Sequence, residues 1–259
     1  MTLSATTTPA LETRGLTIRF GGHVAVNDVS CRFTPGTLTA IVGPNGAGKT
    51  TYFNLISGQL RASSGQVVVD GEDITGLAPS ARTRRGLGRA FQLTNLFPQL
   101  TALENVRLAV QSRSDAGWSL FQVWNTRRDL IEKAEGILER VRLADKRHVA
   151  PKALSHGDQR KLEVALLIAM EPKVFMFDEP TAGMSVDEVP TVLELIHDIK
   201  QRGDATVLLV EHKMDVVRSL SDRIIVLHNG ALVADGEPAE VIASPVVQEA
   251  YLGVETARD

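Results

Sequence analysis

The chain has 259 residues, enough for a large buried core, and its 28 basic and 31 acidic side chains leave a formal net charge of −3. This balance argues against the strongly basic surface of a general nucleic-acid binder, so we expect no nucleic acid among its partners. A single cysteine, Cys31, excludes an internal disulfide and a metal site made of several thiolates, and it fits a reducing, cytoplasmic setting.

The sequence lacks the pattern of a membrane span or of a secretory signal. The longest apolar run near the middle, residues 164–170, is far shorter than the roughly 18 residues that a spanning helix needs. Residues 1–10 are small and polar, without a basic start or an apolar centre. We expect them to form a flexible tail, with regular structure beginning at Leu11.

Several segments have the pattern of strands. Alternating polar and apolar residues at 11–20 predict a half-exposed strand, followed by a turn at Gly21 and Gly22 and a second short strand at 29–33. Four short apolar runs favour strands buried within a sheet, although their length alone leaves a helix open. These runs are residues 38–42, 66–70, 174–178 and 206–211.

Helical patterns separate these strands. Residues 128–141 and 192–199 carry apolar side chains at helical spacing, and residues 162–170 predict an apolar helix. Strands that alternate with helices predict an α/β protein with a mostly parallel sheet. Residues 94–169 contain no convincing strand, so we expect them to form a helical lobe inserted into the α/β core.

One segment has the spacing of a phosphate-binding loop. GPNGAGKT, residues 43–50, matches G-x-x-x-x-G-K-[ST], with an apolar strand before it and a helical segment, TTYFNLIS, after it. Its glycines let backbone N–H groups turn inward around phosphate oxygens, and the helix N-terminus adds a favourable dipole. Lys49 is expected to neutralise phosphate charge, and the Thr50 hydroxyl to ligate Mg²⁺.

The alternative is a glycine-rich turn without a ligand, and eight fitting positions in the right context argue against it. We therefore predict a P-loop NTPase core. The predicted phosphate-binding residues are Gly43, Pro44, Asn45, Gly46, Ala47, Gly48, Lys49, Thr50 and Thr51.

A pair of carboxylates follows a second apolar run. In VFMFDEP, residues 174–180, Asp178 is placed to hold Mg²⁺ through water and Glu179 to orient an attacking water. Taken alone, an Asp-Glu pair at a strand end is more often a solvated turn. A parallel sheet carries its ligands at the carboxyl ends of its strands, so the phosphate loop gives this pair a definite role.

Together with LSHGDQ at residues 154–159, these motifs resemble the nucleotide-binding subunits of ABC transporters, over residues 11–253. The resemblance implies one ABC ATPase domain with an N-terminal antiparallel β subdomain and the helical lobe, and residues 254–259 as a C-terminal tail. LSHGDQ resembles the signature motif of the family. The resemblance therefore implies that Ser155 and Gly157 bind the γ-phosphate of ATP held by the opposite subunit.

Three further residues take roles from the same resemblance. Gln92 stands in the place of the glutamine that contacts Mg²⁺ and the attacking water, and His212 in the place of the histidine that bonds the γ-phosphate. Phe20 matches the aromatic residue that stacks on adenine, with a core phenylalanine as an equal alternative. The implied catalytic residues are Glu179, His212, Gln92 and Lys49, and the implied Mg²⁺ ligands are Thr50, Gln92 and Asp178.

The sequence departs from the commonest form of the family at three positions. His156 replaces a glycine, Asp158 replaces a glutamine, and Ser185 replaces an aspartate. Ser155 and Asp158 have the spacing of a helix cap, so we expect the Asp158 carboxylate to point back toward the cap rather than toward a phosphate.

Within the family, LSHGDQRKLEVA, DEPTAGM and VEHKMDVV are most similar to importers of branched-chain and other hydrophobic amino acids. This resemblance implies an ATPase that uses ATP and Mg²⁺ at the cytoplasmic face of a bacterial inner membrane. Its implied partners are a second ABC ATPase subunit, membrane permease subunits and, indirectly, a periplasmic solute-binding protein. Importers of urea or aromatic acids and a soluble, non-transport ABC ATPase remain open. A GTP switch would share the phosphate loop, but the sequence contains no N-K-x-D guanine signature.

Two stretches are candidates for docking membrane partners, namely residues 93–100 and the segment that holds Trp118, Phe121 and Trp124. Each is open to the alternative of lobe core. A local basic cluster, Arg82, Arg84, Arg85 and Arg89, has the pattern of a solvated face that could attract acidic lipids.

Overall fold

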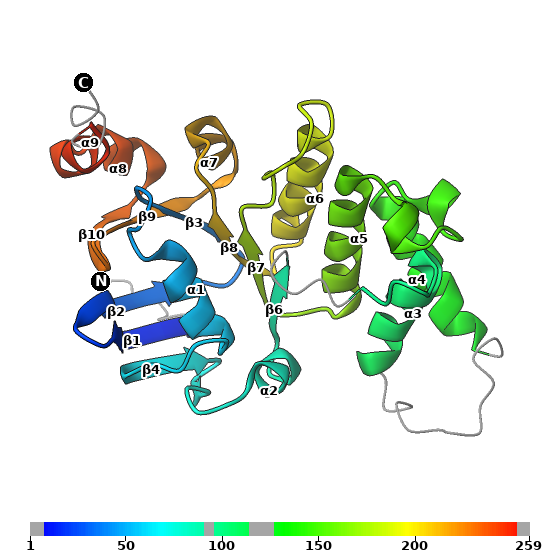
Figure 1. The fold of residues 1–259 in the computed structure, drawn as a ribbon, viewed down its shortest axis with the longest axis horizontal. Coiled ribbons are helices and arrows are strands. Elements are labelled where there is room, and N and C mark those ends of the chain that lie inside the picture. The colour runs from blue at the N-terminus through cyan, green and yellow to red at the C-terminus, as the bar shows by residue number, and fades with distance from the viewer. Residues whose placement is uncertain (1–7, 91–95, 114–126, 253–259) are drawn as a thin grey trace, which may run out of the picture. The chain divides into compact units, whose positions relative to one another are not determined.

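The computed structural model describes residues 8–90, 96–113 and 127–252, drawn as a ribbon in Figure 1. The chain forms two compact units. The first unit comprises the chain up to Leu87, Lys173–Glu179 and the chain from Ile199 onward, and the second comprises Gly88–Pro172 and Pro180–Asp198. The second unit is larger than the helical lobe predicted at residues 94–169, because it also includes Pro180–Asp198.

An antiparallel sheet opens the first unit, in the order β2-β1-β4-β5 (Figure 1). Its strands are β1 at Leu11–Phe20, β2 at His23–Phe33, β4 at Ser64–Val69 and β5 at Glu72–Asp73. The predicted second strand at 29–33 was too short, because the hairpin pairs from Phe20 and His23 at its turn. The expected antiparallel β subdomain is confirmed.

A second sheet supplies the α/β core of this unit. Its strands within the unit lie in the order β10-β9-β3-β8-β7, parallel from β9 to β7, with β10 antiparallel at the edge. They are β3 at Leu38–Val42, β7 at Val174–Asp178, β8 at Thr206–Val210, β9 at Arg223–His228 and β10 at Ala231–Gly236. The mostly parallel sheet is confirmed, but the sequence prediction missed β9 and β10. RIIVLH in β9 carries the same apolar signal as the strands that were found.

Helices complete both units. Those of the first unit are α1 at Lys49–Ser57, α2 at Pro79–Arg84, α7 at Met214–Leu220, α8 at Pro238–Ala243 and α9 at Pro245–Leu252. The second unit holds α3 at Ala102–Arg113, α4 at Arg128–Arg140, α5 at His156–Ala169 and short 3₁₀ turns at Ala144–Lys146 and Pro151–Ala153. At the divisions of the chain between the units lie β6 at Leu87–Ala90 and α6 at Val189–Gln201. Among the described residues, no helix is both long and apolar enough to cross a bilayer.

The helix after the phosphate loop is fixed by a continuous core. Tyr52 and Phe53 of α1 are fully buried in a cluster that includes residues of both sheets of the first unit. The Tyr52 hydroxyl is also hydrogen-bonded to Thr13 Oγ1 of β1 at 2.8 Å, which satisfies two buried polar groups. The start of α1, and with it the phosphate loop, is therefore held against both sheets.

A buried arginine caps the other end of α1. Arg82 of α2 is only 3% exposed, and its Nη1 donates to the carbonyls of Leu55 and Ile56 at 2.7 Å each. Its Nη2 and Nε donate to Thr75 O and Leu77 O at 2.6 and 3.0 Å. The expectation of a solvated basic cluster is wrong for Arg82, because four backbone carbonyls bind its guanidinium.

Replacing Arg82 by Met should lower the free energy of unfolding by about 2–4 kcal/mol, since buried carbonyls would lose their donors. Urea unfolding measures this difference. The control is Arg84→Met, an exposed position on the same helix, which should change the free energy by less than about 0.5 kcal/mol. Equal effects of the two substitutions would contradict the capping role of Arg82.

Candidate functional site

The phosphate loop is a tight connection between β3 and α1. Gly43 has no room for a side chain, because an added Cβ would lie 2.1 Å from the carbonyl oxygen of Leu227 in β9. Gly48, directly before α1, has a φ of 97°, and an added Cβ would lie 2.5 Å from Ala25 O. The glycines of the motif thus let the loop pack against β9 and β2, while the first N–H groups of α1 have no partner within the helix.

Lys49 lies inside this loop. Its Nζ donates to the carbonyl oxygens of Gly43 at 2.7 Å and Pro44 at 2.9 Å, and the side chain is buried. Burial lowers the pKa of Lys49, an effect that the nearby carboxylates of Glu179 and Asp178 partly offset. A cation, a helix N-terminus and a backbone loop at one point fit a phosphate group.

The acid pair ends strand β7. Asp178 is its last residue and is buried, while Glu179 is half-buried and has a φ of 50°, which is uncommon for a residue other than glycine. The Glu179 N–H donates to Val210 O of β8 at 2.9 Å, which holds this turn. The chain thereby leaves the sheet directly after Asp178. The Asp178 carboxylate and the Thr50 hydroxyl are oxygen donors of the kind that Mg²⁺ prefers.

His212 meets Glu179 at this edge of the sheet. It follows the end of β8, and its Nε2 lies 2.7 Å from Glu179 Oε1. An ionised carboxylate can only accept, so Nε2 is then the donor. The backbone N–H of His212 is bound by the buried carboxylate of Glu211 at 2.7 Å. Glu211 was not among the predicted site residues, although an acidic residue at the end of an apolar strand, beside a candidate histidine, is a usable sequence signal.

The structure therefore brings four of the predicted residues together in the first unit. Lys49, Asp178, Glu179 and His212 lie where β3, β7 and β8 end, which are neighbouring parallel strands. The carboxyl ends of such strands are the usual ligand site of an open α/β sheet.

Ser155 and Gly157 lie in the second unit, at the start of α5. Ser155 is the N-cap of the helix, and its Oγ accepts from the backbone N–H of Asp158 at 3.1 Å, as the spacing predicted. Gly157 is buried, and His156 is exposed. Both residues belong to a different unit from Lys49.

The comparisons with known proteins decide the family. The ABC transporter family matches residues 26–182, and the branched-chain amino acid ATP-binding cassette transporter family matches residues 231–257. The chain belongs to the ABC transporter ATP-binding family. It is an ATPase subunit by this membership, and the nucleotide-binding fold predicted from the sequence is confirmed.

Individual relatives cover nearly the whole chain. The high-affinity branched-chain amino acid transport ATP-binding protein BraF of Pseudomonas aeruginosa is 38% identical over 95% of this chain and 98% of its own length. LivG of Escherichia coli K12, with the same description, is 36% identical over the same shares. Among solved structures, the ADP conformation of MJ1267, an ATP-binding cassette of an ABC transporter, has a TM-score of 0.80 and 30% identity, with 94% of this chain and 98% of that chain covered.

The other predicted site residues differ in exposure, and some lie outside the described residues. Phe20 at the end of β1 is 50% exposed, so the alternative of a core phenylalanine is wrong. Thr50 is exposed, and Thr51 is half-buried. Gln92 lies outside the described residues, as do Trp118, Phe121 and Trp124. Of the docking stretch at 93–100, the structure describes residues 96–100, where Phe97 is exposed.

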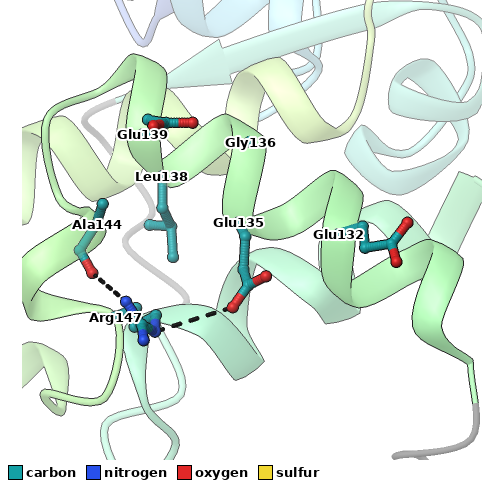
Figure 2. Close-up of a pocket in the computed structure, with 7 residues that line it drawn as sticks. All are labelled: Glu132, Glu135, Gly136, Leu138, Glu139, Ala144 and Arg147. Carbon is teal, nitrogen blue, oxygen red and sulfur yellow. Dashed lines mark hydrogen bonds and ion pairs between the residues drawn. The ribbon is translucent and has the colours of Figure 1, made fainter.

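A cavity of about 490 Å³ lies along α4 in the second unit and contains none of the predicted site residues. Figure 2 shows Glu132, Glu135 and Glu139 of α4 on its wall, with Arg147 opposite. Arg147 Nε lies 3.8 Å from Glu135 Oε1, and Arg147 Nη1 donates to Ala144 O at 3.2 Å. This acidic wall is an exposed face of the helix.

Asp158, which replaces the usual glutamine, is paired with two lysines. Lys146 Nζ lies 2.5 Å from one carboxylate oxygen and Lys161 Nζ lies 3.0 Å from the other, while the residue is only 4% exposed. Burial works to raise the pKa of Asp158, but hydrogen bonds from Lys146 and Lys161 lower it below its ordinary value. The two lysines bind both carboxylate oxygens and compensate the charge of Asp158.

Replacing Asp158 by Asn should lower the free energy of unfolding by about 1–3 kcal/mol at neutral pH, because two lysines lose a buried counter-ion. The folded-state pKa lies below the unfolded value, so this contribution is complete above roughly pH 4 and is lost as the pH falls through the folded pKa. Urea unfolding of both proteins from about pH 7 down to about pH 3 should give a difference in free energy that narrows below about pH 4. A constant difference would contradict this assignment, and Asp145→Asn, at an exposed neighbouring position, serves as the control.

Proposed function

We propose that this chain is the ATP-hydrolysing subunit that powers an inner-membrane importer of branched-chain or other hydrophobic amino acids. The substrate class comes from the relatives, since BraF and LivG are described as branched-chain amino acid transport proteins. The observation that supports hydrolysis is the hydrogen bond between Glu179 and His212 beside Lys49. The subunit acts at the cytoplasmic face of a bacterial membrane, bound to permease subunits.

In the proposed reaction, water attacks the γ-phosphorus of ATP in line with its bond to the β,γ-bridging oxygen, and that bond breaks as ADP leaves. Glu179 accepts a proton from that water. The Glu211 carboxylate binds the backbone N–H of His212, and the His212 ring holds the Glu179 carboxylate and then bonds the γ-phosphate. Lys49 exchanges the carbonyls of Gly43 and Pro44 for phosphate oxygens. A magnesium ion held by Thr50, Asp178 and Gln92 would neutralise charge on the phosphates.

The other proposed nucleotide contacts follow the family resemblance. Residues 43–51 surround the phosphates, and the exposed ring of Phe20 stacks on adenine. A second ATPase subunit supplies Ser155 and Gly157 to the same γ-phosphate. Pairing is supported by a relative of known structure, the dimeric bacterial ABC transporter cassette MJ0796, which has a TM-score of 0.76 and 25% identity, with 88% of this chain and 98% of that chain covered.

Replacing Glu179 by Gln should reduce ATP hydrolysis by about 10²–10⁴-fold while ATP binding is retained, because the substitution removes only the proton acceptor. Phosphate release measures turnover, and calorimetric titration with Mg·ATP measures binding. The control is Glu171→Gln, an exposed acid paired with Lys133 in the second unit, which should leave turnover unchanged. Near-normal turnover of Glu179→Gln would remove Glu179 from its proposed role.

Deleting the gene that encodes this chain should abolish uptake of radiolabelled leucine, isoleucine and valine through the proposed importer. The wild-type chain should restore uptake, and Glu179→Gln should not, because transport needs hydrolysis. Loss of urea or aromatic-acid uptake instead would favour a related importer, and unchanged uptake of all these solutes would favour a soluble, non-transport ATPase.

A further inference from the structure

Residues 155–157 already contact an anion from their own chain. Ser155 Oγ donates to Glu188 Oε1 at 3.5 Å, a long hydrogen bond. The Glu188 carboxylate also lies directly against Gly157, since an added Cβ on that glycine would be 2.0 Å from Oε1 and 2.2 Å from Cδ. One carboxylate therefore covers both residues that the proposed function assigns to a γ-phosphate of the partner subunit.

Glu188 is held in this position by its own turn. Its other oxygen, Oε2, accepts from Ser185 Oγ at 3.0 Å and from the Ser185 backbone N–H at 3.3 Å. Ser185 stands where the family usually has an aspartate, and an ionised aspartate has no proton to donate to Glu188. The serine at this position therefore suits a carboxylate that points at residues 155–157.

The Ser155 hydroxyl has one proton to give. The Ser155 oxygen accepts a hydrogen bond from the Asp158 N–H. The carboxylate oxygens of Asp158 accept hydrogen bonds from Lys146 and Lys161. The Ser155 proton is thus directed to Glu188. A γ-phosphate at the start of α5 needs the same proton and the same face of Gly157, and two anions repel each other in one place.

We propose that Glu188 is a further residue of the nucleotide site, whose carboxylate occupies the place of the partner's γ-phosphate on Ser155 and Gly157 and is exchanged for it on pairing. This inference rests on the proposed function, in which two subunits enclose ATP. The exchange sets the Mg·ATP concentration at which subunits pair. Glu188 is outside the phosphate loop and the acid pair, so ATP binding to the single subunit does not depend on it.

Three proteins test the proposal, namely Glu179→Gln alone, Glu179→Gln with Glu188→Gln, and Glu179→Gln with Asp187→Asn. Glutamine at position 188 still has an oxygen that accepts the hydrogen bonds from Ser185, but it carries no charge. Asp187 is its exposed neighbour, so Asp187→Asn makes the same charge change without the contact to Ser155. Light scattering against Mg·ATP concentration measures pairing, and a fluorescent ATP analogue at low protein concentration measures binding to the single subunit.

Glu188→Gln should lower the Mg·ATP concentration for half-maximal pairing by about three- to tenfold, as expected for removing one competing charge, while Asp187→Asn changes it by less than about twofold. Binding to the single subunit and the thermal midpoint should stay the same in all three. Unchanged or weaker pairing of a folded Glu188→Gln protein would overturn the proposal.

If Glu179→Gln binds ATP but stays monomeric, the pairing of identical subunits fails, and the role of Glu188 is tested without it. Amide NMR during a titration with inorganic sulfate follows Gly157 directly in the Glu188→Gln and Asp187→Asn proteins. A shift of the Gly157 signal at a sulfate concentration at least about threefold lower in Glu188→Gln supports the proposal. Equal responses of the two proteins would overturn it.

Discussion

The parallel pairing of β7 with β8 is the constraint on which the candidate site depends. Asp178 pairs with Val210, and the next residue, Glu179, donates its N–H back to the Val210 carbonyl in a left-handed conformation. Such a conformation costs on the order of 1 kcal/mol for a residue with a side chain, and the strand pairing outweighs it. The result is that the ends of two strands present Glu179 and His212 to each other at 2.7 Å.

The phosphate loop reaches this edge because α1 is fixed at both of its ends. Close backbone contacts of Gly43 and Gly48 position the start of the helix, and the Arg82 guanidinium binds its last carbonyls. Between these ends, Tyr52 and Phe53 are buried in the core of the first unit. A helix held in this way cannot move away from the sheet when Lys49 changes its hydrogen-bond partners, so binding of phosphate is expected to alter side chains rather than the fold.

The sequence predicted the parts of the structure that follow short-range rules. The loop at residues 43–50, the strand before Asp178 and the cap at Ser155 each depend on neighbours within a few residues, and each was placed correctly. Long-range contacts left no such pattern. Arg82 was expected in a solvated cluster, because nothing in its surroundings in sequence shows that it binds the carbonyls of Leu55 and Ile56, which are 27 and 26 residues away. The contact of Glu188 with Ser155, 33 residues away, is of the same kind.

In the proposed function, each unit presents a helix N-terminus to phosphate, and in each unit the chain's own groups already make the hydrogen bonds concerned. Lys49 at α1 bonds the carbonyls of its own loop, and Ser155 at α5 bonds Glu188. Polar groups that are paired before the ligand arrives are not left unsatisfied, so neither site is destabilised in the free protein. The two exchanges differ in the charge that the incoming phosphate meets. Phosphate approaches a cation at Lys49 but must replace an anion at Ser155, so binding to one subunit is favoured over pairing, and pairing waits until ATP is already bound.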